Sequence, residues 1–221
     1  MHKTVIIVAG GTGTRMGSDI PKQFMLLGKR PLLMHSIQAF YNYDNTISII
    51  LVLPEDKFDQ WGTLCKKYNL NIVHQLVAGG ETRFNSVKNG LDRADESSLV
   101  AIHDGARPLI KPDLIKKCFK YALKNGNAVP VVEPADSIRI IQENKNTSIN
   151  RKFLKIVQTP QVFHTEIIKK AFEQKYSDNF TDEANVAESF GEIIRLIKGN
   201  QENIKITRPE DLIYAEALMK K

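Results

Sequence analysis

Short apolar runs alternate with amphipathic segments along most of the chain. The apolar runs are rich in β-branched residues and bounded by turn formers, which is typical of strands in a parallel sheet covered on both faces. The predicted strands are residues 5–9, 47–53, 72–77, 99–102 and 128–132. Apolar residues three or four positions apart predict helices at residues 31–41, 54–68, 82–91 and 111–124. This alternation predicts an α/β fold, a three-layer α/β/α Rossmann-like arrangement with a mostly parallel sheet.

The pattern changes between residues 136 and 157. Residues 137–141 alternate weakly, residues 142–150 are polar and rich in turn formers, and residues 153–157 are apolar again. This predicts a protruding β-hairpin arm, with a flexible loop as the alternative. Because a lone hairpin is only marginally stable in water, we expect the arm to pack on something, most simply the same arm of a second copy.

Beyond the arm, mixed structure returns. The spacing predicts helices at residues 165–174, 182–189 and 209–219, and strands at residues 193–197 and 203–206. Lys205 lies between two isoleucines, and strand alternation would place it on the face opposite to them. Since the sequence contains no linker and no internal repeat, we expect one domain over residues 1–221, with residues 136–157 as a dimerisation arm.

A glycine-rich loop follows the first predicted strand. Four glycines occur within residues 10–17, and two cations, Arg15 and Lys22, lie within it or just beyond it. Backbone N–H groups in such a loop can approach a phosphate closely, and the two cations would offset its charge. The loop is therefore predicted to bind a polyphosphate, with an ordinary strand-to-helix turn as the alternative.

Two common phosphate-binding patterns do not fit this loop. No Gly-Lys-Ser/Thr follows at the Walker A spacing, and Met16 occupies the third glycine position of the dinucleotide pattern. The second predicted strand ends in Leu53-Pro54 rather than in an acidic residue that could bind a ribose. An NAD-binding oxidoreductase is therefore disfavoured.

Two further strand ends carry candidate site residues. Gly80 precedes a helix that Thr82 could cap, and Ser86 lies one turn into it, which would suit readout of a flat base. Asp104 and Arg107 follow the fourth strand. Asp104 could hold a magnesium ion or a substrate hydroxyl, and an ion pair with Asp104 is the alternative for Arg107. Carboxyl ends of parallel strands lie at one edge of a sheet, so these turns and the glycine loop can converge on one pocket.

Composition narrows the class of ligand. The chain of 221 residues has a net charge of +6, which suits an anionic partner. Its lysines and arginines are dispersed and do not interleave with aromatic residues, which favours phosphorylated small molecules over nucleic acid. No apolar run approaches the length of a membrane span, so we expect a cytoplasmic protein with no membrane partner. The cysteines, Cys65 and Cys118, and the histidines show no zinc-binding spacing.

A set of motifs in a fixed order identifies a family. The segments are residues 9–17 with Pro21-Lys22-Gln23, 79–86, 103–108, 159–161, 181–184 and 204–211. The first loop resembles the sugar-nucleotide pyrophosphorylase-like nucleotidyltransferases. The full set resembles one branch of them, the 2-C-methyl-D-erythritol 4-phosphate cytidylyltransferase family.

The resemblance implies transfer of CMP from CTP to 2-C-methyl-D-erythritol 4-phosphate in the non-mevalonate route to isoprenoid precursors. It implies a divalent cation such as Mg²⁺, held by the CTP phosphates or by Asp104, and a homodimer formed through the arm. By resemblance, Arg15 and Lys22 stabilise the transition state, while Lys205 and Arg151 position the acceptor substrate, Arg151 from the partner copy. The implied CTP-binding residues are Ala9, Gly10, Gly11, Gly13, Gly80, Ser86 and Asp104. The implied substrate-binding residues are Arg107, Ser137, Thr159 and Thr181.

Some features of the sequence depart from the family pattern or leave alternatives open. Residues 131–137 are longer than the usual segment, and Ser137 stands where a threonine is usual. Ribitol-5-phosphate cytidylyltransferases share the loop and the chemistry, although residues 182–184 and 207–211 look more like the methylerythritol branch. A nucleotide-sugar pyrophosphorylase would be longer. A non-catalytic nucleotide-binding regulator would need the loop but not Arg151 and Lys205 together.

Overall fold

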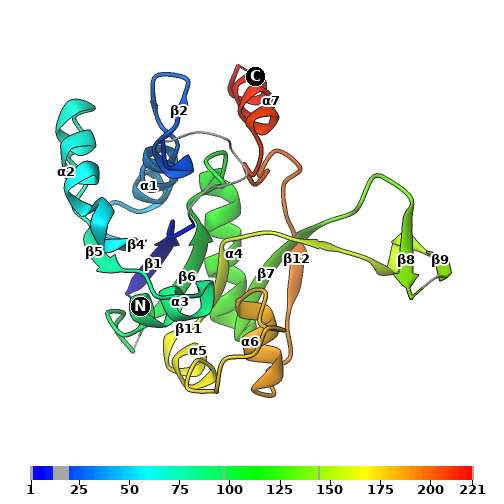
Figure 1. Cartoon of the computed structure of the whole chain (residues 1–221). Coiled ribbons are helices and arrows are strands. Elements are labelled where there is room, and N and C mark those ends of the chain that lie inside the picture. Colours follow the sequence, from blue (N-terminus) through cyan, green and yellow to red (C-terminus); the bar gives the residue numbers. More distant parts are fainter. Residues whose placement is uncertain (1, 12–19, 97, 144, 221) are drawn as a thin grey trace.

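Eight strands form the central sheet of the computed structural model, which describes residues 2–11, 20–96, 98–143 and 145–220 (Figure 1). β1 (Lys3–Val8) lies parallel to β4 (Ser48–Leu53) on one side and to β6 (Leu99–Asp104) on the other. β5 (Gln75–Ala78) extends the sheet beyond β4. Because these four strands run in one direction, their carboxyl ends meet at one edge of the sheet.

The other half of the sheet is built around β7 (Asn127–Val132). β11 (Gln161–His164) lies antiparallel between β6 and β7, and β10 (Ile156–Val157) continues along the same edge of β7. β12 (Leu196–Lys198) pairs in parallel with the other edge. The mostly parallel sheet is thus confirmed. The sequence did not predict β11, because it is only four residues long and begins with a buried glutamine rather than an apolar residue.

Helices cover both faces of the sheet (Figure 1). Alternate side chains of β1 enter different cores: Val5 and Ile7 belong to one, Ile6 belongs to the other, and all three are fully buried. A parallel sheet covered on both faces requires this pattern. The predicted three-layer α/β/α fold is confirmed. The first face is covered by α1 (Leu32–Tyr43), α2 (Phe58–Lys67) and α4 (Pro112–Asn125), and the second by α3 (Arg83–Leu91), α5 (Thr165–Ala171) and α6 (Glu183–Ser189).

A smaller apolar cluster joins the two ends of the chain beside the carboxyl edge of the sheet. It consists of Leu27, Leu32, Ile206 and Ala215. The elements around it are η2 (Lys22–Phe24), β2 (Leu26–Leu27), β3 (Arg30–Pro31) and α7 (Pro209–Met219). Elsewhere in the chain, the short helix η3 (Glu55–Lys57) leads into α2. The helix predicted at residues 209–219 is therefore confirmed.

The prediction of a strand at residues 203–206 is wrong. Within the part of the chain that the structure describes, the segment forms no hydrogen-bond ladder with a neighbouring strand, although Ile206 N–H donates to Ala106 O at 2.8 Å. Ile206 is nevertheless buried and the Lys205 side chain is 41% exposed, so the expected alternation of side chains holds without a strand.

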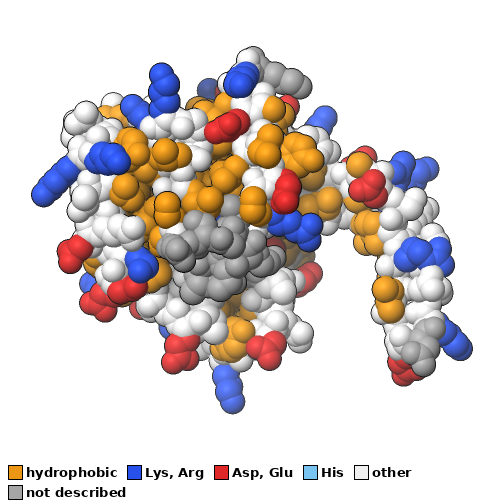
Figure 2. Space-filling view, turned by 45° about the horizontal axis from the view of Figure 1, so that its top comes forward, with side chains coloured by type: hydrophobic (Ala, Val, Ile, Leu, Met, Phe, Trp, Pro, Cys, Tyr) orange, Lys and Arg blue, Asp and Glu red, His pale blue; other side chains and the backbone are white. Residues whose placement is uncertain are grey.

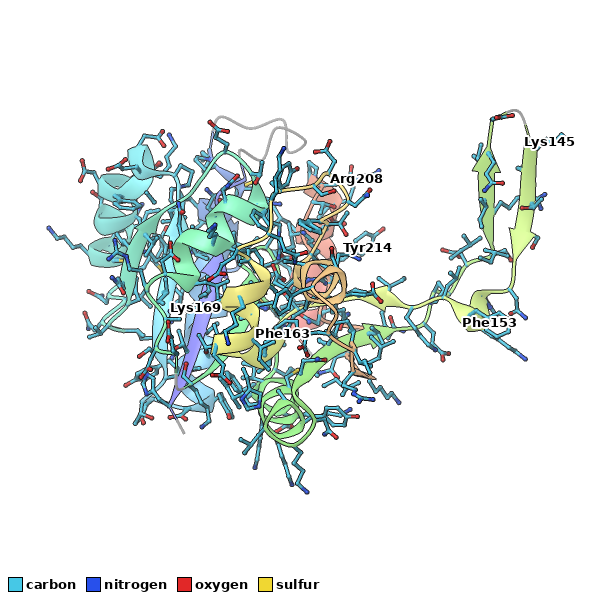
Figure 3. All side chains as sticks on the ribbon, turned by 90° about the horizontal axis from the view of Figure 1, so that it is seen from below. Lys145, Phe153, Phe163, Lys169, Arg208 and Tyr214 are labelled. Carbon is cyan, nitrogen blue, oxygen red and sulfur yellow. The ribbon has the colours of Figure 1, made fainter. Side chains whose placement is uncertain are left out.

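A β-hairpin arm projects from the core, as predicted (Figures 1 and 3). It pairs β8 (Ile138–Gln142) with β9 (Lys145–Ile149) in antiparallel register. The predicted position of the second strand is wrong, because β9 lies in the segment expected to be a turn. Both faces of β9 are largely exposed, so its polar sequence lacks the apolar alternation that reveals a half-buried strand. After β9 the chain forms η4 (Arg151–Phe153) and rejoins the core sheet as β10.

Among the described residues, no helix is both long enough and apolar enough to cross a membrane.

Candidate active site

A cavity of about 400 Å³ lies at the carboxyl edge of the sheet, where β1, β5 and β6 end. Backbone hydrogen bonds set the start of two of the adjoining turns: Gly105 N–H donates to Val8 O at 2.9 Å, and Gly79 N–H donates to Leu53 O at 2.8 Å. The cavity brings together many of the predicted site residues, namely Ala9, Gly10, Gly11, Lys22, Gly80, Ser86, Asp104 and Lys205. The predicted residues Gly13 and Arg15 lie outside the described residues.

A second cavity, of about 520 Å³, lies at the opposite ends of β1 and β4, near Thr4 and Ser48. Its lining includes charges of both signs, such as Arg93 and Asp95. The glycine turns that suit phosphate binding lie at the carboxyl edge instead, as is usual in parallel α/β sheets. The smaller cavity is therefore the candidate active site.

The Gly79-Gly80 turn is held in place by the start of α3. Gly80 N–H donates to Ser86 Oγ at 3.1 Å, and Ser86 Oγ donates to Thr82 O at 2.9 Å. Thr82 caps the helix as predicted, because its Oγ1 accepts Asn85 N–H at 3.1 Å. A Cβ on Gly80 would collide with the Asn85 side chain, so this position requires glycine. The turn presents peptide groups to the cavity in a fixed geometry.

Asp104 is the centre of a charged network at the end of β6. Its Oδ2 lies 2.9 Å from Lys205 Nζ, and its Oδ1 lies 3.1 Å from Arg83 Nη2. Arg107 Nε is 3.6 Å from Oδ2, too far for a good hydrogen bond but close enough for electrostatic attraction. Burial alone would raise the pKa of Asp104, but the charges of Arg83, Lys205 and Arg107 outweigh it and hold that pKa well below its usual value. Asp104 is therefore a carboxylate at neutral pH.

Thr159 and Arg107 lie behind Asp104, not in the cavity lining. Thr159 Oγ1 accepts Asp104 N–H at 3.0 Å and lies 3.0 Å from His103 Nδ1, while His103 Nε2 lies 3.2 Å from Arg107 O. Arg107 Nη1 donates to Asn203 O at 2.8 Å, and Asn203 Nδ2 donates to Thr159 O at 2.8 Å. The geometry of Arg107 matches the alternative interpretation, in which it shapes the turn. Burial lowers the pKa of His103 to about 4.

Three other predicted residues do not line this cavity. Arg151 is exposed on η4 in the arm, where its Nη1 donates to Ala135 O. Ser137 is exposed at the start of the arm. Thr181 is exposed before α6, and its Oγ1 donates to Asn185 Oδ1 at 2.5 Å. Within a single copy, Arg151 and Ser137 lie in the arm, whereas Thr181 lies two positions before Glu183, which contacts the cavity residue Arg83.

Arg83 and Glu183 belong to the site, although the sequence reasoning missed them. Arg83 lines the cavity, and its Nη1 lies 2.5 Å from Oε1 of the fully buried Glu183. Burial raises the pKa of Glu183, and the nearby Arg83 charge opposes that rise. An acidic residue directly after the helix cap Asp182 is ordinarily explained by the helix dipole, so the sequence pattern did not indicate a buried ion pair.

The described side chains do not form a metal site by themselves. No group of three or more His, Cys, Asp or Glu side chains among them could hold a metal ion. Asp104, the predicted ligand, already contacts Lys205 and Arg83 with its two oxygens. These contacts fit a partner for cations within the protein rather than a metal ligand.

Comparison with known proteins identifies the family. The family model described as IspD, 2-C-methyl-D-erythritol 4-phosphate cytidylyltransferase, matches residues 3–221. A 2-C-methyl-D-erythritol 4-phosphate cytidylyltransferase from Azobacteroides pseudotrichonymphae is 51% identical over 220 residues, which is 99% of each chain. One from Bacteroides fragilis is 44% identical over 219 residues, covering 99% of this chain and 100% of the relative.

Solved structures agree with the sequence relatives. The 4-diphosphocytidyl-2C-methyl-D-erythritol synthase of Anaerococcus prevotii matches with a TM-score of 0.84 at 29% identity, covering 100% of this chain and 96% of that one. The 2-C-methyl-D-erythritol 4-phosphate cytidylyltransferase of Francisella tularensis matches with a TM-score of 0.81 at 30% identity, covering 98% of this chain and 99% of that one. This chain therefore belongs to the IspD family, the 2-C-methyl-D-erythritol 4-phosphate cytidylyltransferases.

Proposed function

We propose that this protein transfers CMP from CTP to 2-C-methyl-D-erythritol 4-phosphate. An oxygen of the acceptor phosphate forms a bond to the α-phosphorus of CTP, and the bond from that phosphorus to the bridging oxygen of the β-phosphate breaks. The electron pair leaves with pyrophosphate, and the other product is 4-diphosphocytidyl-2-C-methyl-D-erythritol. The observation that carries this proposal is the family match over residues 3–221.

The cavity offers the chemistry that such a reaction needs. Two anionic groups must approach each other, so the main task of the protein is to align them and to stabilise their charge. Lys22 and Lys205 both line the cavity, and Gly10 and Gly11 bring peptide groups to its wall. In this proposal Lys22, with Arg15, stabilises charge at the α-phosphate, while Lys205 binds the acceptor. The cytosine lies against Gly80 and Ser86.

A divalent cation, most simply Mg²⁺, would enter with the CTP phosphates. The support is the tight pairing of Asp104 with cations, which leaves phosphate oxygens as the better ligands. When bound, such an ion would neutralise charge on the triphosphate.

We also propose that residues 1–221 act as one domain that dimerises through the arm, residues 136–157. The arm exposes Ile141 (78% exposed) and Phe153 (83% exposed), and Figure 2 shows apolar side chains along it and where it joins the core. A two-stranded hairpin with such a surface gains stability by packing on a partner. Arg151 would then reach the cavity of the second copy and bind the acceptor phosphate.

The decisive experiment measures pyrophosphate release by the purified chain with CTP, Mg²⁺ and each of two acceptors. We expect a higher kcat/KM with 2-C-methyl-D-erythritol 4-phosphate than with ribitol 5-phosphate, and loss of turnover after EDTA treatment. A higher kcat/KM with ribitol 5-phosphate would show that the protein is instead a ribitol-5-phosphate cytidylyltransferase. Binding of CTP without turnover on either acceptor would favour a non-catalytic nucleotide-binding regulator.

A further inference from the structure

Arg83 lies between two carboxylates at the wall of the cavity. Its Nη1 and Nη2 lie 2.5 Å and 3.2 Å from the two oxygens of Glu183. Its Nη2 and Nε lie 3.1 Å and 3.4 Å from Asp104 Oδ1. One N–H of Nε, one of Nη1 and both of Nη2 are used, so four of the five guanidinium donors are committed. Arg83 therefore has too few donors left to grip a phosphate with two parallel hydrogen bonds.

Glu183 is a rigid anchor for this guanidinium. Its side chain is fully buried at the start of α6. The start of that helix is fastened to β11 by the buried Gln161, whose Nε2 donates to Asp182 Oδ2 at 3.0 Å and whose Oε1 accepts Ala184 N–H at 2.8 Å. A two-point contact between a guanidinium and a carboxylate fixes the plane of both groups. The core sheet thus sets the position of Arg83 through Glu183.

Asp104 receives a cation at each of its oxygens. Arg83 holds Oδ1, and Lys205 lies 2.9 Å from Oδ2. Arg83 and Glu183 together add no net charge to the cavity, so their contribution is geometric rather than a gain in positive potential. Without Arg83, Asp104 would lose its hydrogen bonds at Oδ1 and be left with Lys205 and the longer 3.6 Å contact with Arg107, so the half-exposed Lys205 would be held less firmly.

We propose that Arg83 and Glu183 form a positioning pair that fixes Asp104, and through it Lys205, in the geometry that receives the acceptor substrate. The inference rests on the proposed function, because it takes Asp104 and Lys205 to contact that substrate. Arg83 itself acts through Asp104 and not on the phosphates.

The main test removes both charges of the pair. Replacing one partner alone would strand a buried charge and could unfold the protein, so Arg83→Gln is combined with Glu183→Gln. We expect kcat/KM for pyrophosphate release to fall about 10- to 100-fold, as when a group that orients a ligand is lost, with the KM for CTP changing less than that for the acceptor. Lys88→Gln with Glu188→Gln, on the same two helices, is the matched control and should retain wild-type kinetics. Wild-type kinetics in the pair variant would overturn the proposal.

A double-mutant cycle separates positioning from direct contact with substrate. If Arg83 acts through Asp104, adding the pair substitutions to Asp104→Asn should cost no further activity. Losses that multiply would mean that Arg83 acts on the substrate independently, which overturns the proposal.

A measurement without substrate keeps this inference apart from the proposed function. The ¹³C shift of the Asp104 carboxyl reports its ionisation in the free protein, where Arg83, Lys205, Arg107, His103 and Glu183 face it; Arg83 contacts Asp104 directly, so loss of its charge outweighs loss of the more distant Glu183 charge. In the pair variant, protonation of Asp104 should begin at a higher pH than in the wild type. In the control variant it should begin at the same pH as in the wild type. An unchanged titration overturns the inference even if the wild type proves to have no turnover, a result that would count against the proposed function alone.

Discussion

At the scale of single residues, the hydrogen bonds behind Asp104 require one protonation state of His103. Its two ring nitrogens contact Thr159 Oγ1 and Arg107 O. A carbonyl can only accept, so Nε2 must carry a hydrogen. The Thr159 hydroxyl accepts Asp104 N–H and is then free to donate to an unprotonated Nδ1. A second proton on the ring, at Nδ1, would remove the acceptor for the Thr159 hydroxyl and break this chain of hydrogen bonds behind the site.

Stability should therefore fall as the pH drops from about 6.5 to about 4. Burial lowers the pKa of His103 to about 4, so in this range the unfolded chain binds a proton that the folded chain does not. The contribution is on the order of 3 kcal/mol by the end of the range. Burial also lowers the pKa of His35, which acts in the same direction. Urea unfolding at several pH values gives the free energy of unfolding as a function of pH. Between pH 4 and 6.5 this free energy should change less steeply with pH for His103→Gln than for the wild type. An unchanged slope would contradict this account of His103.

Lys22→Ala should lower kcat more than it raises the KM for CTP. An ammonium that acts mainly on charge developing at the α-phosphate affects kcat, and losing one such donor costs on the order of a hundredfold. Lys22→Arg should not restore full activity, because a planar guanidinium does not replace a compact ammonium in a fixed cavity. Steady-state kinetics with varied CTP tests both. A variant with unchanged kcat and weaker CTP binding would show that Lys22 only binds CTP in the ground state and does not stabilise the transition state.

At the scale of elements, the join between β5 and α3 depends on a glycine. A Cβ on Gly80 would overlap the Asn85 side chain and would come within 3.1 Å of its backbone carbonyl carbon. Gly80→Ala should therefore cost about 1–3 kcal/mol of stability and weaken CTP binding, because the start of α3 must shift. Gly62→Ala in α2 is the control: nothing lies within 4 Å of the added Cβ, and alanine should raise stability by about 0.5–1 kcal/mol. Chemical unfolding and calorimetric titration with CTP measure the two effects.

Elements with a strong apolar signal were predictable, and those built on polar or short segments were not. The buried run of β4 and the Thr82 cap of α3 were both predicted from the sequence. The strands β9 and β11 were not, because one is polar on both faces and the other is only four residues long. In the site, Lys22 was predicted from the charged glycine loop, whereas a role for Lys205 was predicted only by resemblance. The Arg83–Glu183 pair joins residues 100 positions apart, and no local pattern predicts such a contact.

At the scale of the whole molecule, the arm carries Arg151 away from the cavity of its own copy. Figure 3 shows η4, where Phe153 is labelled, on the arm and well separated from the core. A residue held there can serve a cavity only if a second copy brings its cavity to the arm. In a symmetric dimer the contribution would be reciprocal, so each cavity would use Arg151 from the other chain.

Two inactive variants should therefore restore each other. When Lys22→Ala and Arg151→Ala dimers exchange subunits, each heterodimer has one cavity with both lesions and one with neither. About a quarter of wild-type activity should return if exchange is random and the cavities are independent. Pyrophosphate release by the mixture, compared with each parent alone, gives the result. A mixture that stays inactive after proven subunit exchange would mean that Arg151 does not act across the dimer.

The pairing of β10 with β7 makes the arm an insertion within a single long hairpin. Ile156 pairs with Val132, and Gln158 N–H donates to Pro130 O at 2.8 Å, so the chain leaves and re-enters the sheet at neighbouring points. To the core fold, residues 133–155 are one surface loop, and the entropy of closing a loop rises only slowly with its length. An arm of different length or sequence could be grafted at this junction without rebuilding the cavity of the same chain, as long as it still carries an arginine to the cavity of the second copy. The rest of the arm can thus evolve, or be engineered, separately from the nucleotide cavity, while Arg151 keeps the choice of partner tied to binding of the acceptor.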